Sequence, residues 1–294
     1  MLTSIVIRTL NEAQYLNGLL TSIHQQKLSN ELRFEVILID SGSTDETLKI
    51  AKHHNCMIGH ITRKEFSFGR SLNIGCQMAK GEILVFISGH CVPKDKQWLQ
   101  ALCLPIMNKQ ADYTYGRQVG GEESQFSEHR IFSKYFPQQS KIPQDGFYCN
   151  NANSALSHKS WKAFQFNEEL TGLEDMDLAR RLVERKGKVA YIAEACVYHH
   201  HSESWSSIQR RFEREAIALQ KIMPQVHIGR RDLIRYIISS IWLDLRASLR
   251  DKTFLKNVKS IILYRFSQYR GSYKGNHEHR ILSHKKKEIY FYPD

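Results

Sequence analysis

Three carboxylates stand close together in one short segment of the chain. Glu174 and Asp175 are adjacent, Asp177 follows, and Arg180 and Arg181 close the segment. Acidic residues suit the first turn of a helix, because unpaired N–H groups and the helix dipole favour negative charge there. Asp177 and Arg180 also have the spacing of an ion pair on a helix surface. A carboxylate at a helix start can instead act as a base toward a hydroxyl, so helix capping and proton transfer are both open.

Two further polar groups follow apolar runs. Asp40 lies in the segment Ile39-Asp-Ser-Gly-Ser-Thr-Asp45 after the run 34–39, and Ser88-Gly89-His90 follows the run 83–87. Each run has the composition of a buried strand. In open α/β sheets ligands bind beyond the carboxyl ends of the strands. We therefore expect the two polar groups to share one crevice.

The segments that must position these residues alternate between strand and helix patterns. Strands are predicted at 4–9, 34–39, 57–62, 82–87 and 189–197. Helices are predicted from Asn11-Glu12 to Ile23, from the turn 41–45 to about His53, and over 70–80. Between Tyr113 and Asn153 the pattern weakens, and its Gly and Pro residues indicate loops. The alternation predicts an α/β protein with helices packed on a largely parallel sheet.

Taken together, Ile39–Asp45 and the segment Glu174-Asp-Met-Asp-Leu178 resemble the inverting glycosyltransferases of family 2, over about residues 3–205. The resemblance implies a GT-A-like, Rossmann-type fold with a mixed, mostly parallel sheet flanked by helices. It also implies an enzyme that moves one sugar from a nucleotide-sugar, with UDP- and dTDP-sugars favoured, to an acceptor hydroxyl with inversion. The acceptor would be a glycan or lipid-linked glycan, in the synthesis of a cell-surface polysaccharide or glycolipid.

The resemblance assigns roles to individual residues. Asp175 is the expected base, and Glu174 is the alternative base or a support for the acceptor. Asp40 is expected to bind the nucleotide base, because a carboxylate needs a donor and the imide N–H of uracil or thymine supplies one. The other donor-binding candidates are Thr9, Asn11, Glu12, Arg70, Ser88, Gly89 and His90. The acceptor-binding candidates are Asn150, Asn153 and Glu174, although turn formation explains the two Asn residues equally well.

The chain departs from the family at its metal-binding motif. Where relatives carry D-x-D, this sequence has Ser88-Gly89-His90, so His90 is the remaining candidate ligand. His199 or His201, after the predicted strand 189–197, is expected to join it. Imidazole suits Mn²⁺ better than Mg²⁺, so the resemblance implies a divalent metal, Mn²⁺ rather than Mg²⁺. Histidines without a metal role are the alternative.

Charge divides the chain into two parts. The net charge is +12, but residues 1–206 hold 23 Lys and Arg against 22 Asp and Glu, whereas residues 207–294 hold 19 against 8. We expect a GT-A-like catalytic domain over 1–206 and a basic, mainly helical extension over 207–294. A basic segment can meet an anionic lipid surface, nucleic acid or an acidic polymer.

The basic part contains a strong helical pattern. Residues 230–249 place apolar side chains three and four positions apart with Arg residues beside them, and a second such segment runs from Phe254 to Phe266. These helices either pack on the catalytic domain or lie on an anionic membrane surface through 230–270. The longest apolar runs are too short to cross a bilayer, and the N-terminus lacks the layout of a signal peptide. Together with six cysteines that form no C-x-x-C pair, this predicts a cytoplasmic protein, peripheral at the inner face of the membrane.

Three alternatives compete with an active transferase. A nucleic-acid-binding protein is suggested by the pI of about 9.4, although the excess charge is confined to the C-terminal part, so no nucleic acid is expected as partner. A catalytically silent protein of the same fold is suggested by the missing D-x-D. A nucleotidyltransferase would carry a Gly-rich, basic loop after its first strand, where this chain has Thr9-Leu-Asn-Glu12.

Overall fold

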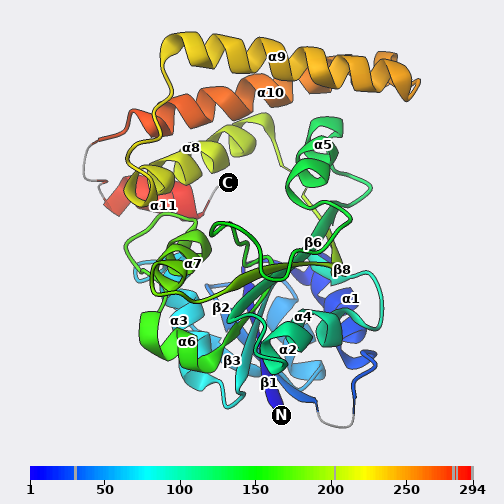
Figure 1. Cartoon of the computed structure of the whole chain (residues 1–294), viewed down its shortest axis with the longest axis vertical. Helices are drawn as coiled ribbons and strands as arrows, with labels where there is room; N and C mark the ends of the chain where they lie inside the picture. Colours follow the sequence, from blue (N-terminus) through cyan, green and yellow to red (C-terminus); the bar gives the residue numbers. More distant parts are fainter. Residues whose placement is uncertain (30–31, 202, 280–281, 283, 293–294) are drawn as a thin grey trace. The chain divides into compact units, whose positions relative to one another are not determined.

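In the computed structural model, residues 1–29, 32–201, 203–279, 282 and 284–292 are described. They form two compact units, which are described separately below (Figure 1). The first unit comprises Met1–Gly121, Phe136–Leu170 and Glu174–His200. The second comprises Glu122–Tyr135, Thr171–Leu173 and His201–Asp294.

The first unit is built on one eight-stranded sheet with the order β3-β2-β1-β4-β7-β6-β8-β5. Its strands are β1 (Leu2–Thr9), β2 (Arg33–Asp40), β3 (Met57–His60), β4 (Ile83–Ser88), β5 (Cys91–Pro93), β6 (Tyr113–Gly120), β7 (Asn153–Ser157) and β8 (Val189–His199). The first four strands are parallel to one another, β7 runs antiparallel to β4 and β6, and β8 is parallel to β6. This confirms the predicted mixed, mostly parallel sheet.

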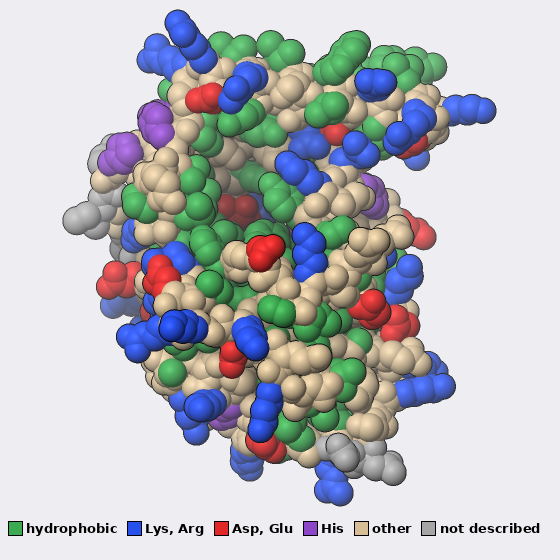
Figure 2. Space-filling model, viewed as in Figure 1, with side chains coloured by type: hydrophobic (Ala, Val, Ile, Leu, Met, Phe, Trp, Pro, Cys, Tyr) green, Lys and Arg blue, Asp and Glu red, His purple; other side chains and the backbone are tan. Residues whose placement is uncertain are grey.

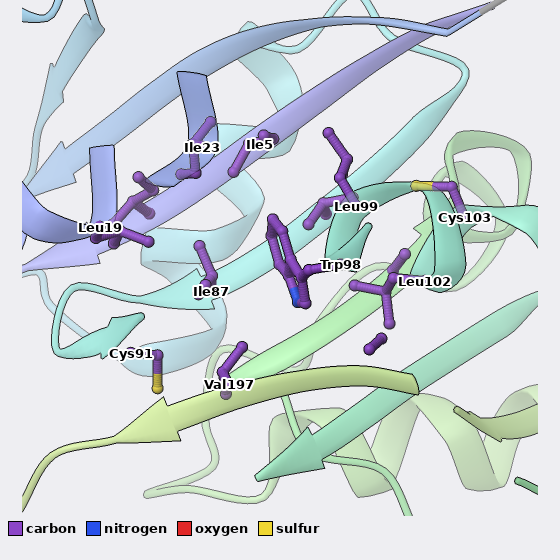
Figure 3. Packing of buried hydrophobic residues seen from close by; sticks show 14 of the residues in the cluster. Ile5, Leu19, Ile23, Ile87, Cys91, Trp98, Leu99, Leu102, Cys103 and Val197 are labelled. Carbon is purple, nitrogen blue, oxygen red and sulfur yellow. The ribbon is translucent and has the colours of Figure 1, made fainter. Parts of the chain in front are cut away.

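Helices cover this sheet because its strands are apolar on both faces. The helices of the first unit are α1 (Ala13–His24), α2 (Thr47–His53), α3 (Phe68–Met78), α4 (Trp98–Met107), α6 (His158–Phe164) and α7 (Glu174–Glu184). Ile5 and Ile87 pack with side chains of α1 and α4, among them the fully buried Trp98 (Figure 3). On the opposite face α3 lies so close to β1 that a Cβ at Gly75 would stand 2.4 Å from Val6 Cγ1. Packing on both faces fixes where the strands end, and hence where the polar groups lie.

The second unit is helical in its described residues. Its helices are α5 (Phe126–Tyr135), α8 (Trp205–Ile222), α9 (Arg230–Arg250), α10 (Phe254–Asn276) and α11 (His284–Phe291). Helix α10 approaches α8 closely, because a Cβ at Gly275 would stand 2.1 Å from the carbonyl oxygen of Glu213. The buried Asp244 of α9 accepts hydrogen bonds of 2.7 Å from Ser127 of α5 and from Arg265 of α10. None of the described helices has the length and apolar character that a membrane-spanning segment needs.

Several predicted elements were incomplete or wrong. The stretch 113–153 is not a run of loops, since it contains β6 and α5. Strand β6 was not predicted, because Thr114, Arg117 and Gln118 interrupt its apolar pattern. Its pairing with β7 and β8 on either side makes it a strand. Helix α10 continues ten residues beyond the predicted end at Phe266. The predicted ion pair of Asp177 with Arg180 is confirmed at 3.4 Å.

Candidate active site

Three of the predicted donor-side residues lie at neighbouring strand ends. Thr9 pairs with Asp40 in the β1–β2 register, and Arg8 pairs with Ser88 in the β1–β4 register. The sheet therefore brings Thr9, Asp40 and Ser88 to one edge, as the sequence predicted. This edge is where an open α/β sheet binds ligands.

Asp40 is held in place by the turn that follows it. One carboxylate oxygen accepts the backbone N–H groups of Gly42 and Ser43 at 2.9 and 3.0 Å. The other lies 3.4 Å from the hydroxyl of Thr9. Gly42 has a φ of 103°, a conformation that favours glycine. Asp40 is thus a buried, oriented acceptor and not a mobile surface carboxylate.

Asn11 holds the same turn from the β1–α1 loop. Its N–H donates to Ser43 Oγ at 2.8 Å, and its side-chain oxygen accepts the N–H of Thr44 at 2.8 Å. These bonds give Asn11 a place in shaping the donor edge. Arg70 differs, because it is exposed on α3 and its Nε lies 3.9 Å from Glu168.

Glu12, Gly89 and His90 form one contact. The Nδ1 atom of His90 lies 2.7 Å from Glu12 Oε1. A Cβ at position 89 would stand 2.8 Å from the Cγ of Glu12, so glycine lets the Glu12 side chain pass. Because a carboxylate only accepts hydrogen bonds, this contact puts a proton on His90 Nδ1.

The tautomer of His199 is set by two hydrogen-bonded amide side chains, those of Asn150 and Gln118. Asn150 Oδ1 accepts the backbone N–H of Ala152 and the side-chain N–H of Gln118, both at 3.0 Å. Gln118 must therefore present its oxygen to His199, whose Nδ1 lies 2.7 Å away. This puts the proton of His199 on Nδ1 as well.

The two rings then face each other through their Nε2 atoms at 3.2 Å. In neutral rings both of these nitrogens carry lone pairs, which repel unless a proton or another cation is shared between them. A carboxylate or carbonyl oxygen behind each imidazole is also the usual outer shell of a histidine metal site. The donor set therefore fits a divalent transition metal better than Mg²⁺. Gln118 was missed by sequence analysis, because its role depends on β6 lying beside β8.

His201 belongs to the second unit and has partners there. Its Nδ1 lies 2.8 Å from Glu128 Oε1. Arg211 donates to both Glu128 and Glu203, at 3.2 and 2.6 Å. This network links the start of α8 to α5, and it engages His201 within its own unit.

The predicted catalytic carboxylates both belong to the first turn of α7, as the helix-start pattern indicated. Asp175 Oδ2 accepts the N–H of Asn151 at 2.7 Å, and Oδ1 accepts the N–H of Met176 at 2.7 Å. Burial, and then the neighbouring charge of Glu174, raise the pKa of Asp175 to about 7. A carboxyl group with such a pKa is suited to accept a proton near neutral pH.

Glu174 has a different environment. Its carboxylate lies 3.4 Å from Arg8 Nη1, and the Arg8 guanidinium stacks 4.8 Å from the Phe68 ring centre. Arg8 is the residue of β1 directly before Thr9. Its ion pair with Glu174 therefore joins the donor edge of the sheet to the start of α7. Glu174 is thus the partner of Arg8, whereas Asp175 beside it has the raised pKa.

The three asparagines Asn150, Asn151 and Asn153, the last of which begins β7, have distinct roles. Asn153 is fully buried, accepts from Trp98 at 2.8 Å, and donates to the carbonyls of Arg117 and Ala195 at 3.0 and 2.8 Å. The amide of Asn153 thus has a structural function, and Asn150 orients Gln118 toward His199. Asn151 was missed by sequence analysis. Its oxygen accepts from Tyr113 and Ser154, but its buried Nδ2 has no hydrogen-bond partner among the described residues.

Solved structures with the same architecture define the class of protein. The mannosyltransferase PcManGT of Pyrobaculum calidifontis, solved with GDP-Man and Mn²⁺, has a TM-score of 0.64 at 14% identity, covering 95% of this chain and 88% of that chain. TarS of Staphylococcus aureus has a TM-score of 0.54 at 16% identity, covering 95% and 93%. The fold is therefore that of the GT-A glycosyltransferases, as predicted.

The sequence gives the family. The profile described as "Glycosyl transferase family 2" matches residues 4–163, more than half of the chain. This protein therefore belongs to glycosyltransferase family 2 and is an enzyme of that class. The O-antigen chain rhamnosyltransferase RfbN of Salmonella typhimurium is 25% identical over 69% of this chain and 67% of its own length. WbaN of Salmonella anatum, with the same description, is 27% identical over 60% and 59%.

Proposed function

We propose that this enzyme transfers one sugar from a nucleotide-sugar, with UDP- and dTDP-sugars favoured, to a hydroxyl of a glycan or lipid-linked glycan, with inversion. The observation that carries the proposal is the buried Asp175, whose pKa is raised to about 7 in the first turn of α7. Relatives named as O-antigen rhamnosyltransferases and a structure of TarS with UDP-GlcNAc support the substrate class. Residues 1–206 would carry the chemistry, and residues 207–294 would form a basic extension.

In the proposed reaction Asp175 takes the proton of the acceptor hydroxyl. The hydroxyl oxygen forms a bond to the anomeric carbon from the face opposite the nucleotide. The bond from that carbon to the diphosphate oxygen breaks, and its electron pair leaves with the diphosphate. One displacement of this kind inverts the anomeric centre. Asn151 donates its backbone N–H to Asp175, and its side-chain Nδ2, which has no hydrogen-bond partner among the described residues, is proposed to donate to the acceptor sugar.

On the donor side Asp40 would accept the imide N–H of uracil or thymine, with Thr9 and Asn11 holding its turn. Ser88 and Gly89 would line the diphosphate, and Arg70 would add positive charge. His90 and His199 would hold a divalent cation, Mn²⁺ rather than Mg²⁺, as the Mn²⁺ in the PcManGT structure also suggests. When bound, such a cation offsets the charge of the leaving diphosphate. His201, whose Nδ1 lies 2.8 Å from Glu128 Oε1, stays the alternative to His199 as the second ligand.

The test begins with donor binding. Thermal unfolding would be followed with UDP, dTDP, GDP, CMP and ADP, each with Mn²⁺, with Mg²⁺ or with EDTA. A ligand that binds the native state raises the melting temperature by mass action. We expect the largest shift with UDP or dTDP plus Mn²⁺, followed by release of the nucleotide from the matching sugar nucleotide. If no nucleotide raises the melting temperature and no sugar nucleotide is consumed, the proposal is wrong.

A further inference from the structure

Helix α9 carries an exposed apolar face. Ile234, Ile238, Trp242 and Leu249 are each more than half exposed, Trp242 by 66%. The first three are four residues apart, so they lie on one side of the helix. Another side of α9 is used inside the second unit, where Asp244, Ala247 and Ser248 are buried. The α9 outer face, meaning Ile234, Ile238, Trp242 and Leu249, is therefore separate from the packed side.

Helix α10 adds a second exposed row. Leu255, in its first turn, is 90% exposed, and Ile262 and Phe266 follow at helical spacing. Lys259 and Arg270, four residues after Leu255 and Phe266, are exposed as well. The row thus combines apolar and cationic side chains along one face.

Positive charge surrounds these rows. Residues 230–259 contain eight Lys and Arg but three Asp, and one of the three, Asp244, is buried and paired with Arg265. Arg231, Arg235 and Arg246 are exposed within one turn of Ile234 or Trp242. Figure 2 shows hydrophobic side chains along α9 with Lys and Arg side chains at its ends. An exposed apolar surface with a cationic border is an unusual feature for the outside of a protein.

We propose that the α9 outer face and the exposed row of α10 bind an anionic lipid bilayer. The apolar side chains would enter the interface between headgroups and acyl chains, with Trp242 near headgroup depth. The Arg and Lys stems would lie along this surface while their charges reach the lipid phosphates. This inference concerns a surface apart from the proposed catalytic residues, and it would place the enzyme beside a lipid-linked acceptor.

The same surface suits other partners less well. A second copy related by a two-fold axis would bring the Arg and Lys residues of two α9 helices together, and like charges repel. A nucleic acid would match the charge but leaves no apolar surface to cover Ile238 and Trp242. An anionic bilayer matches both the charge and the apolar row.

The experiment is cosedimentation of the full chain with vesicles of phosphatidylcholine, alone or with part of it replaced by phosphatidylglycerol. We expect binding to the anionic vesicles that weakens with salt and little binding to phosphatidylcholine alone. The variant Ile238→Ser/Trp242→Ser should lower affinity at least about tenfold, given the apolar area that it removes. Arg231→Gln/Arg246→Gln should reduce the preference for anionic vesicles. Leu104→Ser, at an exposed Leu of α4 in the first unit, is the matched control and should bind as the parent does.

Melting temperatures would show whether each variant is folded. If the Ile238→Ser/Trp242→Ser variant does not fold, the Arg231→Gln/Arg246→Gln variant still tests the proposal. Failure of the parent chain to sediment with anionic vesicles would overturn the proposal. So would equal binding by the parent and by both folded variants. Self-association in solution that the Ile238→Ser/Trp242→Ser variant abolishes, without vesicle binding, would identify a second copy as the partner and also overturn it. Because sedimentation needs no substrate, these outcomes are independent of the proposed transfer reaction.

Discussion

The Nε2 atoms of His90 and His199 face each other at 3.2 Å although the residues are 109 positions apart in the chain. Glu12 fixes one ring and Gln118 fixes the other, each through Nδ1. In our proposal these two facing nitrogens would hold a divalent cation. Such a site would take the place of the acidic motif that the family resemblance led us to expect at Ser88-Gly89-His90.

Replacing His90 tests this pair directly. His90→Ala removes one of the two converging nitrogens, so we expect Mn²⁺ affinity to fall by about 10–100-fold or more. Titration calorimetry with Mn²⁺, and the shift in melting temperature with UDP with and without EDTA, would measure it. His53→Ala, at an exposed His of α2, is the control. Nucleotide binding that ignores both EDTA and His90→Ala would remove the metal from the proposal.

In the proposed metal site Gln118 would act only through His199. Gln118→Met keeps the length of the side chain but removes the acceptor for His199 Nδ1. The ring then loses its fixed tautomer, and Mn²⁺ affinity should fall by roughly 10-fold while His90 is unchanged. The NMR signals of the His199 ring would report the tautomer. Unchanged Mn²⁺ affinity together with an unchanged His199 tautomer would contradict this role of Gln118.

Asp175→Asn tests the base. Asn keeps the size of the side chain but cannot take the proton, so turnover should fall by about 10²-fold or more while donor binding stays nearly intact. Asp177→Asn, in the same turn and paired with Arg181 at 2.9 Å, is the matched control and should lose far less activity. Comparable turnover in the parent and in Asp175→Asn would assign the base elsewhere.

The raised pKa of Asp175 predicts how sugar transfer and stability depend on pH. Transfer should rise with pH through about 7, as the carboxyl group loses its proton. Because the pKa is raised from 3.8 in the folded state, the folded chain binds the extra proton between these values. The free energy of unfolding contributed by Asp175 therefore falls as pH rises from about 4 to about 7, and is constant above that range.

Glu174→Gln separates the two causes of that pKa. It removes the neighbouring charge but leaves the burial, so the midpoint of the rate profile should move to lower pH. Rate profiles of kcat/KM against pH would measure the shift, and Asp175→Asn should show no such midpoint. A midpoint that moves to higher pH in Glu174→Gln would contradict the interpretation.

Asn153 is expected to behave as a structural residue. Asn153→Ala removes three buried hydrogen bonds to Trp98, Arg117 and Ala195, so the free energy of unfolding should fall by about 2–4 kcal/mol. Asn151→Ala removes the acceptor of two buried hydrogen bonds, from Tyr113 and Ser154, so it should also lower stability, but it should in addition raise the KM for the acceptor. Denaturant unfolding and steady-state kinetics would distinguish the two variants. An acceptor KM in folded Asn151→Ala equal to that of the parent would argue against its proposed role.

The sequence by itself determined the fold class and the parts of the site that lie in local patterns. Apolar runs that end on Asp40 and on Ser88 predicted the strand ends, and Glu174-Asp175 predicted a helix start, because strand and helix signals depend on residues near in the chain. Tertiary structure decided which distant residues meet. Pairing of β6 with β8 places Gln118 beside His199, and packing around Trp98 uses the amide of Asn153. It also decided which side of α9 is buried, because the contacts of Asp244 with α5 and α10 bury Asp244, Ala247 and Ser248 and leave the apolar Ile238 and Trp242 exposed.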